Sequence, residues 1–451
     1  MISIYIHIPF CVRKCKYCDF LSFKTTEDTM EAYVEALCRE IELYDLKDKE
    51  AYSIFIGGGT PSLISAEQME RILLKIKCKF NISPNCEISM ECNPGTVDAK
   101  KLARFRKTGI NRLSIGVQST DDNELKTLGR IHNYEDFLKT YQAARDAGFE
   151  NINVDLISAI PGQTVDSYEK TLTNIVNIHP EHISAYSLII EENTEFWDIY
   201  CGDKSVSYAL DGAENRSYAN SGECCTCNDV GELGRNVPRL PDEDDEREMY
   251  YLTKKILGDA GYHRYEISNY ALDGYECRHN KVYWTGQDYV SFGIGAASYI
   301  DGLRYNNISD INEYIEYWTN CKQGVLEDFV RSNTNTVIDT VNVGNELMDD
   351  YRTVTHNYAE TEKGINYPYT DVTPLTTEDM MEEYMYVGLR LCDGISINGF
   401  CDRFGVTMDE IYDEKIDTLI SQGLMDKNGD KLKLTDYGID VSNYVLARFL
   451  L

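Results

Sequence analysis

The sequence has no apolar run that approaches the 18 or so residues needed for a membrane-spanning helix. It also lacks an excess of basic residues, because 44 Lys and Arg stand against 75 Asp and Glu and leave a net charge of −31. A chain this acidic is repelled by nucleic acids and by anionic lipid surfaces. We therefore expect neither nucleic-acid binding nor membrane insertion.

A secretory signal is missing as well, although the chain contains 15 cysteines. The first residues, ISIYIHIP, are typical of a β-strand, so we expect no targeting peptide. Thiols outside the secretory route stay reduced or bind metal. The composition therefore predicts a cytoplasmic protein whose cysteines are free or hold a metal.

Three cysteines follow this first strand within one short loop. Cys11, Cys15 and Cys18 have the spacing Cys-x3-Cys-x2-Cys, with Tyr17 between the last two. Three thiolates can hold three irons of a cubane cluster and leave the fourth iron open, and an open position distinguishes a reactive metal centre from a structural one. A zinc site with a distant fourth ligand, or coincidence, would give the same spacing. We favour the iron–sulfur cluster.

Residues 1–190 alternate strand patterns with amphipathic helix patterns. Repeated βα units imply a parallel sheet. Six such units predict an α/β fold with a partial (β/α)6 barrel of the TIM type, while the pattern alone leaves an open doubly wound sheet as the alternative. We expect strands at Ser3–Ile8, Ser53–Ile56, Glu87–Glu91, Arg112–Val117, Asn151–Leu156 and Ile183–Ile189, and helices at Glu27–Leu46, Ala66–Lys77, Asp98–Lys107, Tyr134–Ala147 and Val165–Ile178.

Unusual side chains gather at the C-terminal ends of these strands, where the loops of such a barrel build the active site. The glycines of GGGTPS let a ligand approach the backbone closely, and a carboxylate in an apolar strand needs a partner. Taken singly, each residue also fits an ordinary turn or an exposed polar position. Besides the cysteines, the set comprises Gly57, Gly58, Gly59, Thr60, Glu91, Gln118 and Asp155.

The rest of the chain divides by composition. Residues 201–237 and 333–375 are polar and have no clear period, so we expect insertions; the first contains a CCTC run without the separated partner pair of a metal site. Helices followed by an Asn-Gly-Asp hairpin predict a winged-helix-like module for docking or as a lid. The predicted domains are the barrel (1–200), the insertion (201–237), a barrel extension (238–332), the second insertion (333–375) and the C-terminal module (376–451).

The barrel extension contains the run CRHNKVYW. Its histidine is of the type that binds haem iron, and its aromatic residues offer flat apolar surface with a polar edge. The residues concerned are His279, Asn280, Tyr283 and Trp284. On the motif alone, a packed aromatic turn with a hydrogen-bonded histidine is the better interpretation.

The motifs also occur in a characteristic order: YIHIPFC, YCDF, GGGTPS, ECNP, GVQS, NVDLI, PDEDDEREMY, YEISNYA, HNKVYW and LTDYG. Together they resemble the HemW family of radical S-adenosylmethionine (SAM) proteins, which is related to oxygen-independent coproporphyrinogen III oxidase. The resemblance covers most of the chain except the two insertions. It implies a radical SAM barrel with a 4Fe–4S cluster and SAM, and a winged-helix-like C-terminal domain.

The resemblance also assigns roles to residues. It implies that Cys11, Cys15 and Cys18 bind the cluster. It implies that His279, Asn280, Tyr283 and Trp284 belong to the haem-binding motif. The residues that it implies for SAM are Tyr5, Tyr17, Gly58, Gly59, Thr60, Glu91, Gln118, Arg130 and Asp155.

Two functions compete under this resemblance. One is a haem chaperone that delivers haem to target proteins such as membrane cytochromes, and the other is an oxidase that decarboxylates two propionates of coproporphyrinogen III. The oxidases have a further cysteine two residues after the third, where this chain has Phe20. We therefore favour the chaperone, and a radical SAM enzyme for another tetrapyrrole ranks third. The sequence does not decide whether the protein cleaves SAM in turnover or whether it forms a homodimer. Any association with a membrane is expected to depend on partner proteins.

Overall fold

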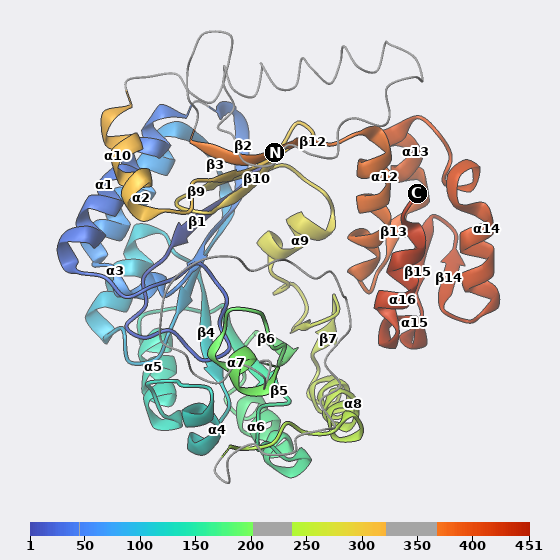
Figure 1. Ribbon diagram of the computed structural model, residues 1–451, viewed down its shortest axis with the longest axis horizontal. Helices are drawn as coiled ribbons and strands as arrows, with labels where there is room; N and C mark the ends of the chain where they lie inside the picture. The colour runs from blue at the N-terminus through green and yellow to red at the C-terminus, as the bar shows by residue number, and fades with distance from the viewer. Residues whose placement is uncertain (45, 202–236, 322–367) are drawn as a thin grey trace, which may run out of the picture.

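The computed structural model describes residues 1–44, 46–201, 237–321 and 368–451 (Figure 1). Most of the two predicted insertions, including the CCTC run, lies outside the described residues. The end of the range 333–375 is described and forms a strand, β12 (Tyr369–Pro374), which joins the main sheet. Among the described residues, no helix is both long and apolar enough to cross a membrane.

Six parallel strands form the centre of the molecule, in chain order across the sheet. Their order and direction confirm the predicted α/β fold with a partial barrel. The second and third strands, β2 and β3, begin well before their predicted starts at Ser53 and Glu87. The reason is that the largely polar stretch Leu46–Ala51 of β2 still pairs with β3. The strands are β1 (Ile2–Ile8), β2 (Leu46–Gly58), β3 (Phe80–Cys92), β4 (Arg112–Gln118), β5 (Ile152–Ser158) and β6 (His182–Ser187).

Further strands extend the sheet at both edges. On the side of β1 the order continues with β9, β10, β11 and β12, of which β9 is parallel to β1 and the others are antiparallel to their neighbours. On the side of β6 it continues with β8 and β7. The bounds are β7 (His263–Arg264), β8 (Asn269–Ala271), β9 (Tyr289–Phe292), β10 (Ala297–Ile300) and β11 (Leu303–Asn307).

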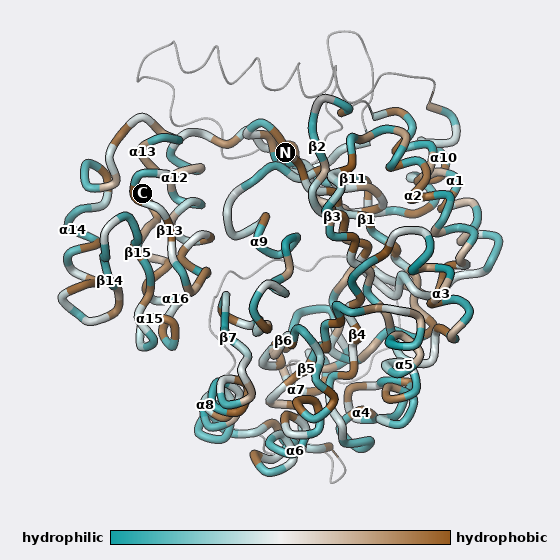
Figure 2. The backbone as a smooth tube through the Cα atoms, turned by 180° about the vertical axis from the view of Figure 1, so that it is seen from behind, coloured by the Kyte–Doolittle hydropathy of each residue, from teal (hydrophilic) through white to brown (hydrophobic). Residues whose placement is uncertain are grey.

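Helices between the parallel strands cover the outer face of the sheet (Figure 1). Their starts are fixed locally, as at α2, where Ser65 and Gln68 form a reciprocal capping box. Figure 2 shows hydrophobic residues gathered along the central strands, while the surrounding helices alternate hydrophilic and hydrophobic residues. The helices between the parallel strands are α1 (Glu27–Leu43), η1 (Pro61–Leu63), α2 (Ala66–Lys79), α3 (Ala99–Thr108), α4 (Asp122–Thr127), α5 (Tyr134–Asp146) and α6 (Val165–Val176); α7 (Glu195–Tyr200), α8 (Glu243–Asp259) and α10 (Ile311–Asn320) follow later in the chain.

The two faces of a central strand contribute to different parts of the molecule, the hydrophobic core and the cavity. In β4, Leu113, Ile115 and Val117 belong to the hydrophobic core. The alternate residues Arg112, Ser114, Gly116 and Gln118 line a cavity inside the barrel. Successive side chains of a strand point to opposite faces, so one strand supplies both the core and the site.

The C-terminal domain has its own hydrophobic core, in which Phe400, Tyr412 and Leu432 are buried. Its small sheet has the order β13-β15-β14, and the β14–β15 hairpin turns at Gly429, which has a φ of 58°. Its elements are α12 (Thr377–Tyr386), η2 (Gly388–Arg390), β13 (Ile395–Ser396), α13 (Ile397–Phe404), α14 (Met408–Ser421), β14 (Met425–Asn428), β15 (Lys431–Leu434), α15 (Asp436–Asp440), α16 (Ser442–Leu446) and η3 (Ala447–Phe449).

A short helix, α9 (Arg278–Trp284), lies between the sheet and the C-terminal domain (Figure 1). It contains the HNKVYW run, for which a packed turn was the better expectation from the motif. Glu87 of β3 accepts hydrogen bonds from the backbone amides of Arg278 and His279 at 3.2 and 3.4 Å. A carboxylate at this position satisfies N–H groups that a helix leaves free at its start, so a tertiary contact supports the helix.

Candidate functional site

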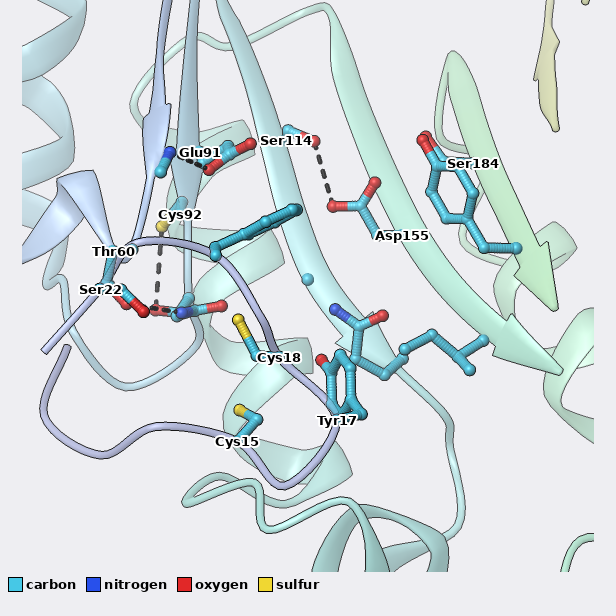
Figure 3. Close-up of a pocket in the computed structure, with 18 of the residues that line it drawn as sticks. Cys15, Tyr17, Cys18, Ser22, Thr60, Glu91, Cys92, Ser114, Asp155 and Ser184 are labelled. Atoms are coloured by element: carbon cyan, nitrogen blue, oxygen red, sulfur yellow. Dashed lines mark hydrogen bonds between the residues drawn. The ribbon is translucent and has the colours of Figure 1, made fainter. Parts of the chain in front are cut away.

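A cavity of about 550 Å³ lies inside the barrel, and its lining includes exposed residues of the cysteine loop and of the segment after β6, such as Phe20 and Ile189. Its size is typical of a small-molecule site. Figure 3 shows Cys15, Tyr17 and Cys18 at one end of the pocket and Glu91, Ser114 and Asp155 farther along it. The residues named from the sequence line this cavity except Gly57 and Trp284; those that do are Tyr5, Cys11, Cys15, Tyr17, Cys18, Gly58, Gly59, Thr60, Glu91, Gln118, Arg130, Asp155, His279, Asn280 and Tyr283.

The three cysteines of the loop are half-buried and free of disulfides. The Sγ atom of Cys11 lies 3.6 Å from Thr60 Oγ1, and Arg130 Nη1 donates to Cys15 Sγ at 3.6 Å. Among the described residues, no three acidic, histidine or cysteine side chains meet closely enough to hold a single metal ion. A cubane cluster does not require such a meeting, because each thiolate binds a different iron.

Two glycines bring the end of β2 against the start of the cysteine loop. Gly58 has a φ of 115°, and a Cβ atom there would lie 2.6 Å from the ring of His7. A Cβ atom on Gly59 would lie 2.8 Å from the carbonyl oxygen of Phe10. Only residues without a side chain allow this close packing, so the GGGTPS run is needed for the geometry of the loop.

Two carboxyl groups face the middle of the cavity. Glu91 Oε2 accepts a hydrogen bond from the backbone amide of Gly58 at 3.0 Å. Asp155 accepts hydrogen bonds from Ser114 Oγ at 3.1 Å and Asn153 Nδ2 at 2.7 Å. Burial, and to a smaller extent the negative charge of Asp155, raises the pKa of Glu91 to about 8. Glu91 is therefore protonated at neutral pH and can donate a hydrogen bond to a ligand.

The end of β4 is strained in a way that points to function. Gln118 has a φ of 71°, a region that non-glycine residues rarely occupy. Its side chain folds back over Gly116, where a Cβ atom would lie 2.7 Å from Gln118 Nε2. The strain places a polar amide in the cavity, and glycine at position 116 makes room for it.

Arg130 ties the strand ends to the cysteine loop. Its Nη2 donates to Asn93 Oδ1 at 2.7 Å and to the carbonyl oxygen of Gly116 at 2.8 Å. Asn93 Nδ2 in turn donates to Thr60 Oγ1 at 2.9 Å. Sequence reasoning missed Asn93, although its position in the ECNP motif was the available signal. Arg130 thus places a positive charge beside the cysteine loop.

The HNKVYW motif divides between two faces of α9. His279 is 1% exposed, and its ring stacks on Phe55 with 5.2 Å between centroids. Its Nδ1 lies 3.0 Å from Ser53 Oγ, and its Nε2 lies 3.1 Å from the Tyr283 hydroxyl. Burial lowers the pKa of His279 to about 3, so the ring is neutral at physiological pH. Trp284 faces the C-terminal domain, where the guanidinium of Arg390 lies 4.6 Å from its ring.

Comparisons with known proteins show which families this chain resembles. Residues 5–175 match the family model described as Radical SAM superfamily, and residues 375–441 match the HemN C-terminal domain. Heme chaperone HemW of Bacillus subtilis is 31% identical, over 100% of this chain and 99% of its own. Heme chaperone HemW of Lactococcus lactis is 30% identical, over 100% and 97%. Heme chaperone HemW of Escherichia coli is 35% identical, over 65% and 69%.

The solved structure of coproporphyrinogen III oxidase (HemN) from Escherichia coli has the same fold. Its TM-score is 0.71 at 19% sequence identity, and the match covers 100% of this chain and 90% of that chain. This likeness confirms the barrel with its C-terminal domain. At this level of identity it concerns the fold and leaves the reaction to the residues of the site.

Proposed function

The chain belongs to the HemW family of radical SAM proteins, and on this premise we propose that it is a haem chaperone, which binds haem and passes it to a target protein. The observation that carries the proposal is the similarity to heme chaperones along the whole chain, 100% of this sequence and 99% of the Bacillus subtilis relative. The radical SAM superfamily implies a 4Fe–4S cluster and SAM as cofactors.

The residues at the open end of the cavity fit these cofactors. We propose that Cys11, Cys15 and Cys18 hold the cluster, with Arg130 balancing part of its negative charge. When bound, the cluster would supply a single electron to SAM if SAM is cleaved. The protein binds and orients SAM with the backbone at Gly58 and the side chains of the cavity, and the surrounding barrel limits access of water.

The residues proposed for SAM differ in chemistry along the cavity. Glu91, protonated at neutral pH, donates a hydrogen bond, whereas Gln118 both donates and accepts. Tyr5 and Tyr17 supply aromatic surface and line the same space. A ligand with a charged end and a hydroxylated ring finds partners for both parts. The proposed set comprises Tyr5, Tyr17, Gly58, Gly59, Thr60, Glu91, Gln118, Arg130 and Asp155.

His279 is suited to bind the haem iron because its ring is neutral. If Nδ1 carries the proton and donates to Ser53, the lone pair of Nε2 faces Tyr283. Haem ligation then requires that Tyr283 and the other side chains that bury the ring move away from Nε2. Asn280 lines the same part of the cavity and completes the proposed haem site.

The competing function is oxidative decarboxylation of coproporphyrinogen III. Phe20 occupies the position of the additional cysteine in the oxidases, and its side chain is 61% exposed at the edge of the cavity. We propose that the haem instead goes to a haem protein such as a membrane cytochrome, reached by docking from the cytoplasm.

The test combines two assays on anaerobically reconstituted protein. Haem titration followed by absorbance should show saturable binding at a single class of site. Incubation with SAM, a reductant and coproporphyrinogen III should leave the mass of the porphyrinogen unchanged. Loss of two carboxyl groups from the porphyrinogen would identify an oxidase, and absence of saturable haem binding would refute the chaperone.

A further inference from the structure

One buried positive charge lines the cavity and has no role in the function proposed above. It is Arg112, and the part of the cavity around it is called the floor here. Arg112 is the first residue of β4; it is 1% exposed and lines the cavity. Its Nη1 donates to Ser89 Oγ at 3.4 Å, and its Nε has no partner among the described residues. Burial of a guanidinium with an unpaired N–H group is unfavourable, so the arrangement is suited to a ligand that supplies an acceptor.

Glu87, an acid whose charge acts on Arg112, is hydrogen-bonded to other groups. Glu87 accepts hydrogen bonds from Ser89 Oγ at 3.3 Å and from Cys277 Sγ at 3.4 Å. It also accepts hydrogen bonds from the backbone amides at the start of α9. Glu87 is therefore linked to Arg112 through Ser89, and its charge and that of Asp155, which lines the same cavity, act on the guanidinium through space, while the Arg112 Nε stays unpaired.

The position along β4 separates Arg112 from the cluster end of the cavity. Arg112, Ser114, Gly116 and Gln118 all line the cavity, and Gln118 lies six residues farther along the strand. At about 3.3 Å per residue, the separation between Arg112 and Gln118 is about 20 Å. Arg112 therefore lies at the opposite end of β4 from Gln118, and Gly116, whose carbonyl oxygen accepts a hydrogen bond from the Arg130 beside Cys15, lies between them.

The residues of the HNKVYW motif, in contrast to the cysteine loop, are linked to Arg112. His279, Asn280 and Tyr283 line the cavity together with Arg112. The charge of Arg112 acts on the imidazole of His279, and Glu87 links the two, since it bonds both Ser89 and the amide of His279. A ligand held by His279 would thus have a buried, donor-rich cation beside it.

We propose that Arg112 forms an anion subsite that binds a carboxylate of the ligand held by α9. On the proposed function, on which this inference rests, the carboxylate is a propionate of haem. A guanidinium binds a carboxylate through two parallel hydrogen bonds, which fixes the orientation of the macrocycle as well as adding affinity. Arg112 would decide which edge of the haem enters the barrel first.

The test compares haem with haem dimethyl ester, which has the same macrocycle and iron but no free carboxylate. Both are titrated by absorbance into the cluster-loaded full chain. A hydrogen-bonded charge pair of this kind corresponds to roughly a 10- to 100-fold preference for haem over the diester. Equal affinity of the wild-type protein for both would overturn the subsite while leaving the chaperone function intact. Absence of binding by either compound would instead refute the chaperone function.

Variants then test whether Arg112 is the residue that binds the carboxylate of haem. Arg112→Gln should bind haem and the diester with about equal affinity, and its affinity for the diester should stay as in the wild type. Arg13→Gln is the matched control, because Arg13 is an exposed arginine at the mouth of the same cavity. A preference that persists in Arg112→Gln, or that disappears in Arg13→Gln instead, contradicts the proposal.

Cluster content after reconstitution reports whether each variant has folded. If Arg112→Gln fails to fold, Arg112→Lys keeps the charge and most of the volume but loses the two-pronged geometry. The preference should then fall by several-fold, and an unchanged preference would overturn the subsite.

Discussion

Glu91 offers a prediction that isolates one group from a chain with 75 acidic residues. Burial raises its pKa from 4.5 to about 8, and Asp155 adds to the shift. In the unfolded chain the carboxyl group loses its proton near its ordinary pKa, whereas the folded protein holds the proton up to about pH 8. The folded state therefore binds more protons between these values, and its stability falls as the pH rises.

The substitution Glu91→Gln removes this dependence and keeps an oxygen that accepts the Gly58 amide. At about 1.36 kcal/mol per pH unit, the wild-type protein should lose up to about 3.5 kcal/mol relative to the variant between pH 5 and pH 8. This value is an upper bound, because water in the cavity lessens the cost of the charge. The variant should thus be the more resistant protein at pH 8.

Urea unfolding of the cluster-free, SAM-free protein, followed by circular dichroism, measures the difference at several pH values. Glu135→Gln serves as the control, since Glu135 is an exposed acid that pairs with Lys139. Its curve of midpoint against pH should run parallel to that of the wild type. Parallel curves for Glu91→Gln and the wild type would refute the raised pKa and with it the protonated carboxyl group in the SAM site.

Three further substitutions test other parts of the site. Cys15→Ala should abolish the brown absorbance of the reconstituted cluster, and retained colour would refute the ligand assignment. His279→Ala should weaken haem binding at least roughly 10-fold while cluster absorbance stays, and unchanged haem affinity would show that another group binds the iron. Gly58→Ala should destabilise the protein by about 1–2 kcal/mol or more, because its φ of 115° is unfavourable for alanine and the Cβ would meet His7. A melting temperature equal to that of the wild type would contradict the packing described for this loop.

The order of the parallel strands could be predicted because it depends on a pattern repeated along the chain. Their extent could not, and β2 shows why. The residues Leu46–Ala51 are largely polar and have no strand pattern, yet they pair with β3 over part of their length. Pairing with a neighbour determines such residues, and the neighbour is distant in sequence. The short helix α4 was missed for a related reason, since six residues carry little periodicity and its start depends on the cap formed by Asp121.

The residues of the site divide in the same way. Motif residues such as Glu91 and Asp155 stand out because polar groups at the ends of apolar strands are unusual. Asn93 and Arg112 do not, because their importance comes from what the fold places beside them: Arg130 in one case and the floor of the cavity in the other. The roles of the individual residues toward the cluster, SAM and haem stay predictions until they are measured.

The HNKVYW motif shows most clearly how local sequence and tertiary contacts share the outcome. A helix of seven residues is too short to be stable alone. In this protein Glu87 of β3 bonds the start of α9, and Arg390 of the C-terminal domain covers Trp284 at its end. The aromatic run therefore becomes a helix because both domains hold it, one at each end. Since His279 and Trp284 lie on that helix, a ligand that displaces it within the barrel must also disturb its contact with the C-terminal domain.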